Sequence, residues 1–88
     1  MRKPADWMQM PTDDRILEVL ESGYRFTPAV IAENIDKSRT HVSRRLSDLT
    51  YYGLVVKPKR GYYEITDRGR AYLSGELDAD DLEDLEDE

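Results

Sequence analysis

The stretch TPAVIAENIDKSRTHVSRRLSDLTYYGLV, residues 27–55, contains two helix starts separated by a tight turn. Thr27 followed by Pro28 is typical of an N-cap residue and the first residue of a helix, and the apolar residues after this pair predict a short, mostly buried helix. Ser38 is a second N-cap residue, and the helix that it begins, 38–52, ends before a glycine. Two short helices joined by so short a turn predict a helix-turn-helix.

The apolar pattern changes from a helical to a strand-like period after these two helices. Residues 54–56 are apolar and mostly β-branched, 57–61 (KPKRG) contain a proline and a glycine, and 62–65 read as a return strand. This order predicts a β-hairpin with its turn at 57–61. A last helix is expected from Thr66 to Leu77, where apolar residues recur at helical spacing.

Another helix precedes the helix-turn-helix. Thr12 is its expected N-cap residue, the charges of Asp13 and Asp14 suit a helix N-terminus, and Gly23 is expected to end it. The order helix, helix, helix, hairpin, helix is that of an α+β winged helix-turn-helix, with a three-helix core, a two-stranded β-hairpin wing and a C-terminal helix.

The chain of 88 residues is long enough for one small domain. We expect an N-terminal arm at 1–11, the winged-helix domain at 12–77 and a disordered acidic tail at 78–88. The formal net charge is −6, but 76–88 hold nine acidic residues and no basic one, which leaves 1–75 with a net charge of +3. The positive charge therefore belongs to the folded part.

The composition excludes several classes of function. No cysteine is present, which rules out disulfides and thiolate metal sites and fits a cytoplasmic protein. No apolar run approaches the length of a membrane span, the N-terminus lacks the apolar core of an export signal, and no glycine-rich phosphate loop is present. Because no nucleophile or acid array surrounds the single histidine, His41, we predict no enzymatic activity, no cofactor, no metal and no small-molecule ligand.

One side of helix 38–52 carries positive charge and hydroxyl groups. On a helical wheel its apolar residues share one side, and the opposite side consists of Thr40, Arg44, Ser47 and Tyr51. Arginine can form two hydrogen bonds with guanine, serine and threonine reach bases or phosphates, and a helix N-terminus donates N–H groups to phosphate. This helix is therefore predicted to recognise double-stranded DNA, with Arg44 and Thr40 as base contacts.

The hairpin turn is a second basic feature. Lys57, Lys59 and Arg60 lie in it without an acidic residue, so that 37–60 carry seven basic residues against Asp48 alone. A basic wing of this kind contacts the DNA backbone or enters the minor groove, where the negative potential is enhanced.

Other interpretations of these charges stay open. On an ordinary surface helix the arginines would pair with acidic neighbours such as Glu33 or Asp36, and Arg39 and Arg45, which border the core, suit a structural role best. The basic turn would also serve solubility and prevent edge-to-edge strand pairing. The whole basic surface would equally suit a protein–protein interaction module that docks an acidic partner.

The segments TPAVIAENIDKSRTHVSRRLSDLTYYGLV and RGYYEITDRGRAYLSGELD resemble archaeal winged helix-turn-helix transcriptional regulators, and most closely the haloarchaeal phage φH repressor-like group. The resemblance covers residues 7–78. It implies double-stranded DNA binding, transcriptional repression and a homodimer. Carried onto this sequence, the recognition helix falls on Ser38–Leu49 and the wing on Val55–Ile65.

Residues of the recognition helix and of the wing are expected to contact DNA, namely Ser38, Arg39, Thr40, His41, Ser43, Arg44, Arg45, Ser47, Lys57, Lys59 and Arg60. The expected function is that of a sequence-specific transcriptional regulator, a repressor, which reads the major groove with 38–52 and contacts the backbone or minor groove with 57–61. The acidity fits a halophilic cytoplasm. Because concentrated salt weakens phosphate binding, direct base contacts and dimeric binding gain weight there.

Two further features lie outside the helix-turn-helix and the wing. Trp7 is expected to pack at the edge of the core, with a dimer contact as the alternative. The tail DADDLEDLEDE lacks the ordered loop of a calcium site, so that it is expected to be solvated. The alternative is that the tail mimics DNA and covers the basic surface.

Overall fold

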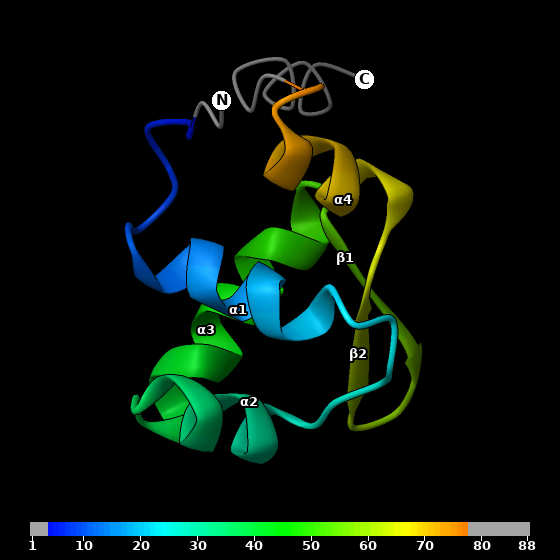
Figure 1. Cartoon of the computed structure of the whole chain (residues 1–88). Coiled ribbons are helices and arrows are strands. Elements are labelled where there is room, and N and C mark those ends of the chain that lie inside the picture. The colour runs from blue at the N-terminus through cyan, green and yellow to red at the C-terminus, as the bar shows by residue number, and fades with distance from the viewer. Residues whose placement is uncertain (1–3, 78–88) are drawn as a thin grey trace.

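The computed structural model describes residues 4–77 of the 88-residue chain. They form four helices and a two-stranded antiparallel hairpin (Figure 1), in the order α1 Thr12–Leu20, α2 Pro28–Ile35, α3 Arg39–Tyr51, β1 Val55–Lys59, β2 Tyr62–Ile65 and α4 Asp67–Ser74. The predicted winged helix-turn-helix is confirmed, with α2 and α3 as the helix-turn-helix. The acidic tail expected at 78–88 lies outside the described residues.

Both predicted N-caps of the helix-turn-helix are confirmed. The Oγ1 of Thr27 accepts a hydrogen bond from the backbone N–H of Val30 at 3.3 Å, and the Oγ of Ser38 accepts one from the N–H of His41 at 3.1 Å. Between the two helices Asp36 adopts the left-handed conformation, with a φ of 58°. An aspartate tolerates this conformation better than most residues, which allows the chain to turn sharply before α3 begins.

The start of α1 differs from the prediction. Thr12 is the first residue of the helix and not its N-cap, Pro11 precedes it, and no side chain caps the first turn. Asp13 is fully buried instead, and its carboxylate accepts a hydrogen bond from the backbone N–H of Gln9 at 3.1 Å. The carboxylate of Asp13, rather than the hydroxyl of Thr12, therefore ties the preceding segment to α1.

A single cluster of buried apolar side chains forms the core of the described residues. Its members from α1 onward, including Leu54 just before β1, are Ile16, Leu17, Leu20, Ile31, Ala32, Ile35, Val42, Leu46, Leu49, Leu54, Val55, Ile65, Tyr72 and Leu73. Ala5 and Met8, from the segment before α1, belong to the same cluster. Val30 is 41 % exposed, so that α2 is less buried than its apolar composition predicted.

The first strand of the hairpin is longer, and the turn is tighter, than predicted, whereas the return strand has the predicted bounds. β1 includes residues 57–59, so that only Arg60 and Gly61 turn the chain. Gly61 has a φ of 87°, the left-handed conformation that two-residue hairpin turns favour. The paired residues are Val55 with Ile65, Val56 with Glu64, and Lys59 with Tyr62. The register is irregular around Pro58, which has no N–H to donate, and this irregularity admits a proline into the strand.

The last helix, α4, ends at Ser74 and not at Leu77 as predicted. Gly75 follows with a φ of 84°, and its N–H donates to carbonyl oxygens of the last turn, which is a common end of a helix. At the other end Thr66 is the N-cap residue, and its hydroxyl also donates to the carbonyl oxygen of Gly53 at 2.7 Å. This one side chain connects the start of α4 to the end of α3.

Candidate nucleic-acid interface

The N-terminus of α3 and the turn of the hairpin lie at the same end of the molecule (Figure 1). The two ends of the described chain lie at the opposite end. We use the name basic face for six exposed residues of α3 and of the hairpin, Thr40, Arg44, Ser47, Lys57, Lys59 and Arg60. The fold therefore places the two basic features of the sequence at the same end of the molecule (Figure 1).

The predicted outward side of α3 is confirmed. Its exposed residues are Thr40, Arg44, Ser47 and Tyr51. Within residues 4–77 the arginines of α3 form no ion pair with Glu33 or Asp36, since the salt bridges there join Arg25 to Glu64 and Arg45 to two aspartates. The guanidinium of Arg44 thus has no ion-pair partner in this part of the chain.

The structure contradicts the prediction of Arg45 as a DNA contact. Its side chain is only 7 % exposed, and its Nε and Nη2 each donate to the buried carboxylate of Asp13 at 2.9 Å. Nη1 donates to Asp48 at 2.8 Å, and Nη2 also donates to the backbone carbonyl of Trp7 at 3.2 Å. Arg45 borders the core side of α3, so these partners and not solvent surround it, as the structural alternative for this residue required.

The electrostatics of Arg45 follow from these partners. Its hydrogen bond with Asp13 raises the pKa of Arg45, and this effect exceeds the opposing effect of burial. A pKa that is raised in the folded state means that the charge stabilises the fold at neutral pH and is lost only at strongly alkaline pH. Arg45 is therefore a permanent internal cation, and its charge is not displayed on the basic face.

The N-cap residue of α3 and the start of the helix supply four further predicted contacts. Ser38 and Arg39 are exposed, whereas His41 and Ser43 are half-buried. The hydroxyl of Ser38 accepts the hydrogen bond of the cap, and its O–H can still donate a hydrogen bond to a phosphate. The structure therefore gives Ser38 a structural role beside the predicted contact.

Ser38→Ala is expected to lower the free energy of unfolding by about 1 kcal/mol, because the backbone N–H of His41 loses its acceptor. Thermal unfolding followed by circular dichroism measures the change. Ser43→Ala, inside the same helix, is the control and is expected to stay within about 0.5 kcal/mol of the wild type. Equal stability of Ser38→Ala and the wild type would contradict the capping role.

The lysines of the hairpin lie over tyrosine rings. The Nζ of Lys57 is 5.6 Å from the ring centroid of Tyr63, and the Nζ of Lys59 is 5.1 Å from that of Tyr62. Both distances are within the range of a cation–π interaction, so the rings help to hold the two cations on the hairpin. The sequence alone did not reveal these pairs, because they depend on the irregular register around Pro58.

Trp7 packs at the edge of the core, as predicted. Its ring stacks on Tyr52 with the centroids 4.0 Å apart and the planes at 10°, and Tyr51 meets Tyr52 edge-on at 5.0 Å. The Nε1 of Trp7 is buried and has no hydrogen-bond partner among the described residues. The stack holds the segment before α1 against the C-terminal end of α3.

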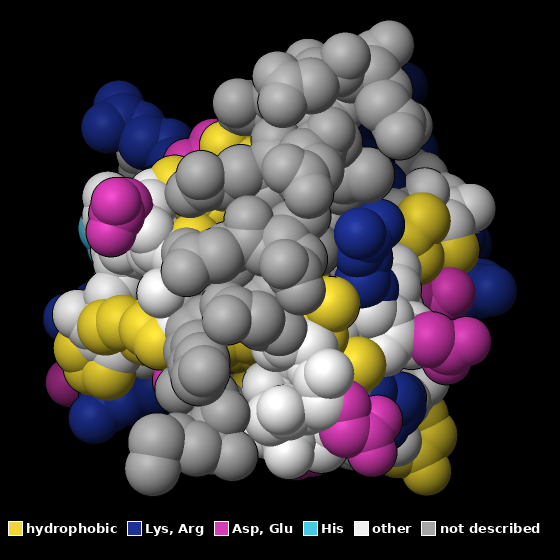
Figure 2. Space-filling model, turned by 90° about the horizontal axis from the view of Figure 1, so that it is seen from above, with side chains coloured by type: hydrophobic (Ala, Val, Ile, Leu, Met, Phe, Trp, Pro, Cys, Tyr) yellow, Lys and Arg dark blue, Asp and Glu magenta, His cyan; other side chains and the backbone are white. Residues whose placement is uncertain are grey.

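The end of the molecule that carries the two ends of the described chain has a mixed surface. Figure 2 views the molecule from this end, and basic and acidic side chains are interspersed over the atoms that are drawn in colour. On α3 and the hairpin tip, by contrast, the four cations of the basic face outnumber Asp48, which is exposed on the same helix. The basic face therefore lies away from the chain ends (Figure 1).

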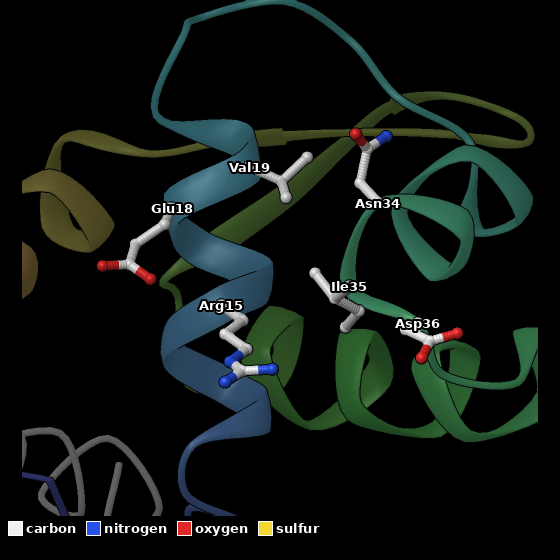
Figure 3. Close-up of a pocket in the computed structure, with 6 residues that line it drawn as sticks. All are labelled: Arg15, Glu18, Val19, Asn34, Ile35 and Asp36. Atoms are coloured by element: carbon white, nitrogen blue, oxygen red, sulfur yellow. The ribbon is translucent and has the colours of Figure 1, made fainter.

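A hollow lies between α1 and α2 (Figure 3). Its volume is about 460 Å³, and it is lined by Arg15, Glu18, Val19, Asn34, Ile35 and Asp36. It is open to solvent, unlike the pockets that bury most of a small ligand.

Residues 4–77 also bring together no cluster of histidine and acidic side chains that could hold a metal ion. None of the helices in this range has the length and the apolar character needed to cross a membrane.

The comparison with known proteins agrees with the fold. The sequence profile of a family described as winged helix-turn-helix phage repressor matches residues 1–85. This chain belongs to that family. A repressor protein of Halobacterium phage phiH is 36 % identical to this chain, and the match covers 94 % of this chain and 98 % of the phage protein.

Solved structures support the same family assignment for this chain. The PhiH1 repressor-like protein from Haloarcula marismortui is 40 % identical in sequence to this chain. Its crystal structure matches with a TM-score of 0.82, and the match covers 90 % of this chain and 91 % of that chain. The adhesin competence repressor from Streptococcus pyogenes is 20 % identical, with a TM-score of 0.67 over 92 % of this chain and 62 % of that one, and shows the fold alone. The predicted family is confirmed, and it is a family of regulators rather than enzymes.

Proposed function

We propose that this protein binds double-stranded DNA in a sequence-specific manner and represses transcription. The observation that carries the proposal is the exposed side of α3, where Thr40, Arg44 and Ser47 lie together and Arg44 has no ion-pair partner among residues 4–77. An arginine beside hydroxyl groups has the donors and acceptors that read base edges in the major groove. Membership in a repressor family supports the same function.

In the proposed complex α3 lies in the major groove. Arg44 donates two hydrogen bonds to a guanine, Thr40 contacts a neighbouring base, and the N–H groups of the first turn face a phosphate. The wing contacts the sugar–phosphate backbone or the minor groove, with Arg60 at its tip. The proposed contact residues are Ser38, Arg39, Thr40, His41, Ser43, Arg44, Ser47, Lys57, Lys59 and Arg60.

The salt of a halophilic cytoplasm decides which of these contacts matter most. Contacts with phosphate lose affinity steeply as salt rises, whereas hydrogen bonds with base edges inside the groove are screened less. We propose that the protein binds as a homodimer, because two recognition helices on two half-sites double the number of base contacts. The target would then be an inverted repeat.

Two substitutions on the basic face separate base recognition from backbone contact. Arg44→Ala is expected to reduce the preference for the best duplex by about 5- to 150-fold, which corresponds to about 1–3 kcal/mol for a bidentate contact with a base. Lys59→Ala is expected to weaken binding to all duplexes alike and to lower the slope of log K against log salt by about one. Fluorescence anisotropy with a library of short duplexes in a potassium chloride series measures both effects.

Arg15→Ala is the matched control, because Arg15 is exposed on α1 outside the basic face. It is expected to leave the duplex preference unchanged. If the wild type bound no duplex at any salt concentration, the proposed function would be wrong, and a module that docks an acidic protein would account better for the basic face.

A further inference from the structure

Three segments of the chain meet at the side chain of Arg45. Its guanidinium belongs to α3, the carboxylate of Asp13 belongs to α1, and the carbonyl of Trp7 belongs to the segment before α1. The Asp13 carboxylate also accepts the backbone N–H of Gln9 from that segment. Asp13 is 0 % exposed and Arg45 is 6 % exposed, so that these bonds form away from solvent.

Stability alone does not account for such a pair. Removing two charges from water is costly, and apolar residues of similar volume often replace a buried ion pair without a loss of stability. The apolar side chains of α3, Val42, Leu46 and Leu49, already pack in the core with 0 % exposure. Apolar contact has no preferred direction, however, whereas two parallel bonds between a guanidinium and a carboxylate fix an orientation.

We propose that the Asp13–Arg45 pair fixes the rotation of α3 about its own axis and thereby positions Arg44 for base recognition. Successive residues of a helix project about 100° apart, so an Arg45 that is held toward α1 directs Arg44 toward the basic face. A rotation of α3 by about 10° would move groups on the helix surface by about 1 Å, given a radius of about 5–6 Å. A displacement of this size disturbs a bidentate contact with a guanine.

A second contact on the same side of α3 supports this role. Tyr52 follows Arg45 by two helical turns, and its ring stacks on Trp7, whose carbonyl accepts a hydrogen bond from Arg45. The segment before α1 thus holds α3 at two points along its length. In this proposal Arg45 and Asp13 are positioning residues, which act through Arg44 and touch no base themselves.

The test rests on the proposed DNA binding and uses the full chain. The double variant Asp13→Leu/Arg45→Met replaces the pair with apolar residues of similar length and branching and leaves the net charge unchanged. We therefore expect it to fold and to bind a scrambled duplex within about twofold of the wild-type affinity, since the charge that attracts phosphates is preserved. Its preference for the best duplex over the scrambled one is expected to fall at least about fivefold, because the base contact is misaligned.

Two more variants complete the experiment. Arg45→Lys keeps the charge but cannot form both bonds with Asp13, so we expect it to lose duplex preference to a similar extent. This variant tests the proposal independently if the double variant does not fold. Asp48→Asn keeps the Asp13–Arg45 pair and is expected to retain the preference. Wild-type preference in a folded double variant, or in Arg45→Lys, would overturn the positioning role. A wild type without any duplex preference would overturn the proposed function itself.

Discussion

Gly69→Ala is expected to lower the free energy of unfolding by about 2–3 kcal/mol and the Tm by about 10 °C or more. Alanine favours an exposed helix by about 1 kcal/mol over glycine, so helix propensity alone would give the opposite sign. At this position, however, a Cβ would overlap the carbonyl oxygen of Leu54 and lie 2.7 Å from Cγ1 of Ile65. A backbone oxygen cannot rotate away, so α4 would have to move off the hairpin.

Thermal unfolding at fixed potassium chloride concentration measures this effect. Ser74→Ala is the matched control, since it also introduces an alanine into α4 but at an exposed position at the end of the helix. We expect its Tm to stay close to that of the wild type. A Gly69→Ala variant as stable as the wild type would show that α4 does not pack against the chain after α3 as closely as the structure describes.

Arg45→Met is expected to lower the free energy of unfolding by about 3–5 kcal/mol, because the buried carboxylate of Asp13 loses its cation. The thioether side chain fills much of the space of arginine but donates no hydrogen bond. For a small domain this loss approaches the whole stability, so that the variant is expected to be partly unfolded at room temperature. Urea denaturation at constant salt gives the free energy of unfolding and its slope.

The same measurement on Asp13→Leu/Arg45→Met tests the cause of this loss. The double variant is expected to recover most of the stability, since neither charge remains unpaired in the interior. Asp13→Leu alone is expected to be destabilised, because Arg45 then lacks its buried partner. If the effects of the two single substitutions simply added in the double variant, the two side chains would not be coupled, and the account of Arg45 as an internal cation would fail.

Local chemistry is what made the helix-turn-helix predictable from the sequence. Thr27 and Ser38 cap their helices in the structure as the sequence indicated. The presence of the hairpin was predictable, but the residues that form its turn were not. The residues KPK look like part of a turn because a proline disrupts most strands, and only the irregular register around Pro58 reconciles them with β1.

The outward side of α3 was predictable because a helical period separates its apolar and polar residues. The same period placed Arg44 outward and Arg45 at the border of the core, but it could not show which group Arg45 would bind. Their different roles depend on Asp13, which lies 32 residues before Arg45 in the sequence, and no local pattern connects the two. The same limit applies to the start of α1, where the tertiary partners of Asp13 determine the geometry and Thr12 caps nothing.

Selection of duplexes from a randomised pool by the wild-type protein tests the central claim most directly. The selection is carried out at several potassium chloride concentrations up to molar levels. We expect one family of sequences to be enriched at every concentration, with a guanine at the position that Arg44 contacts and with the two half-sites of an inverted repeat. Binding without enrichment of any sequence, or no binding at all, would contradict sequence-specific DNA recognition by the basic face.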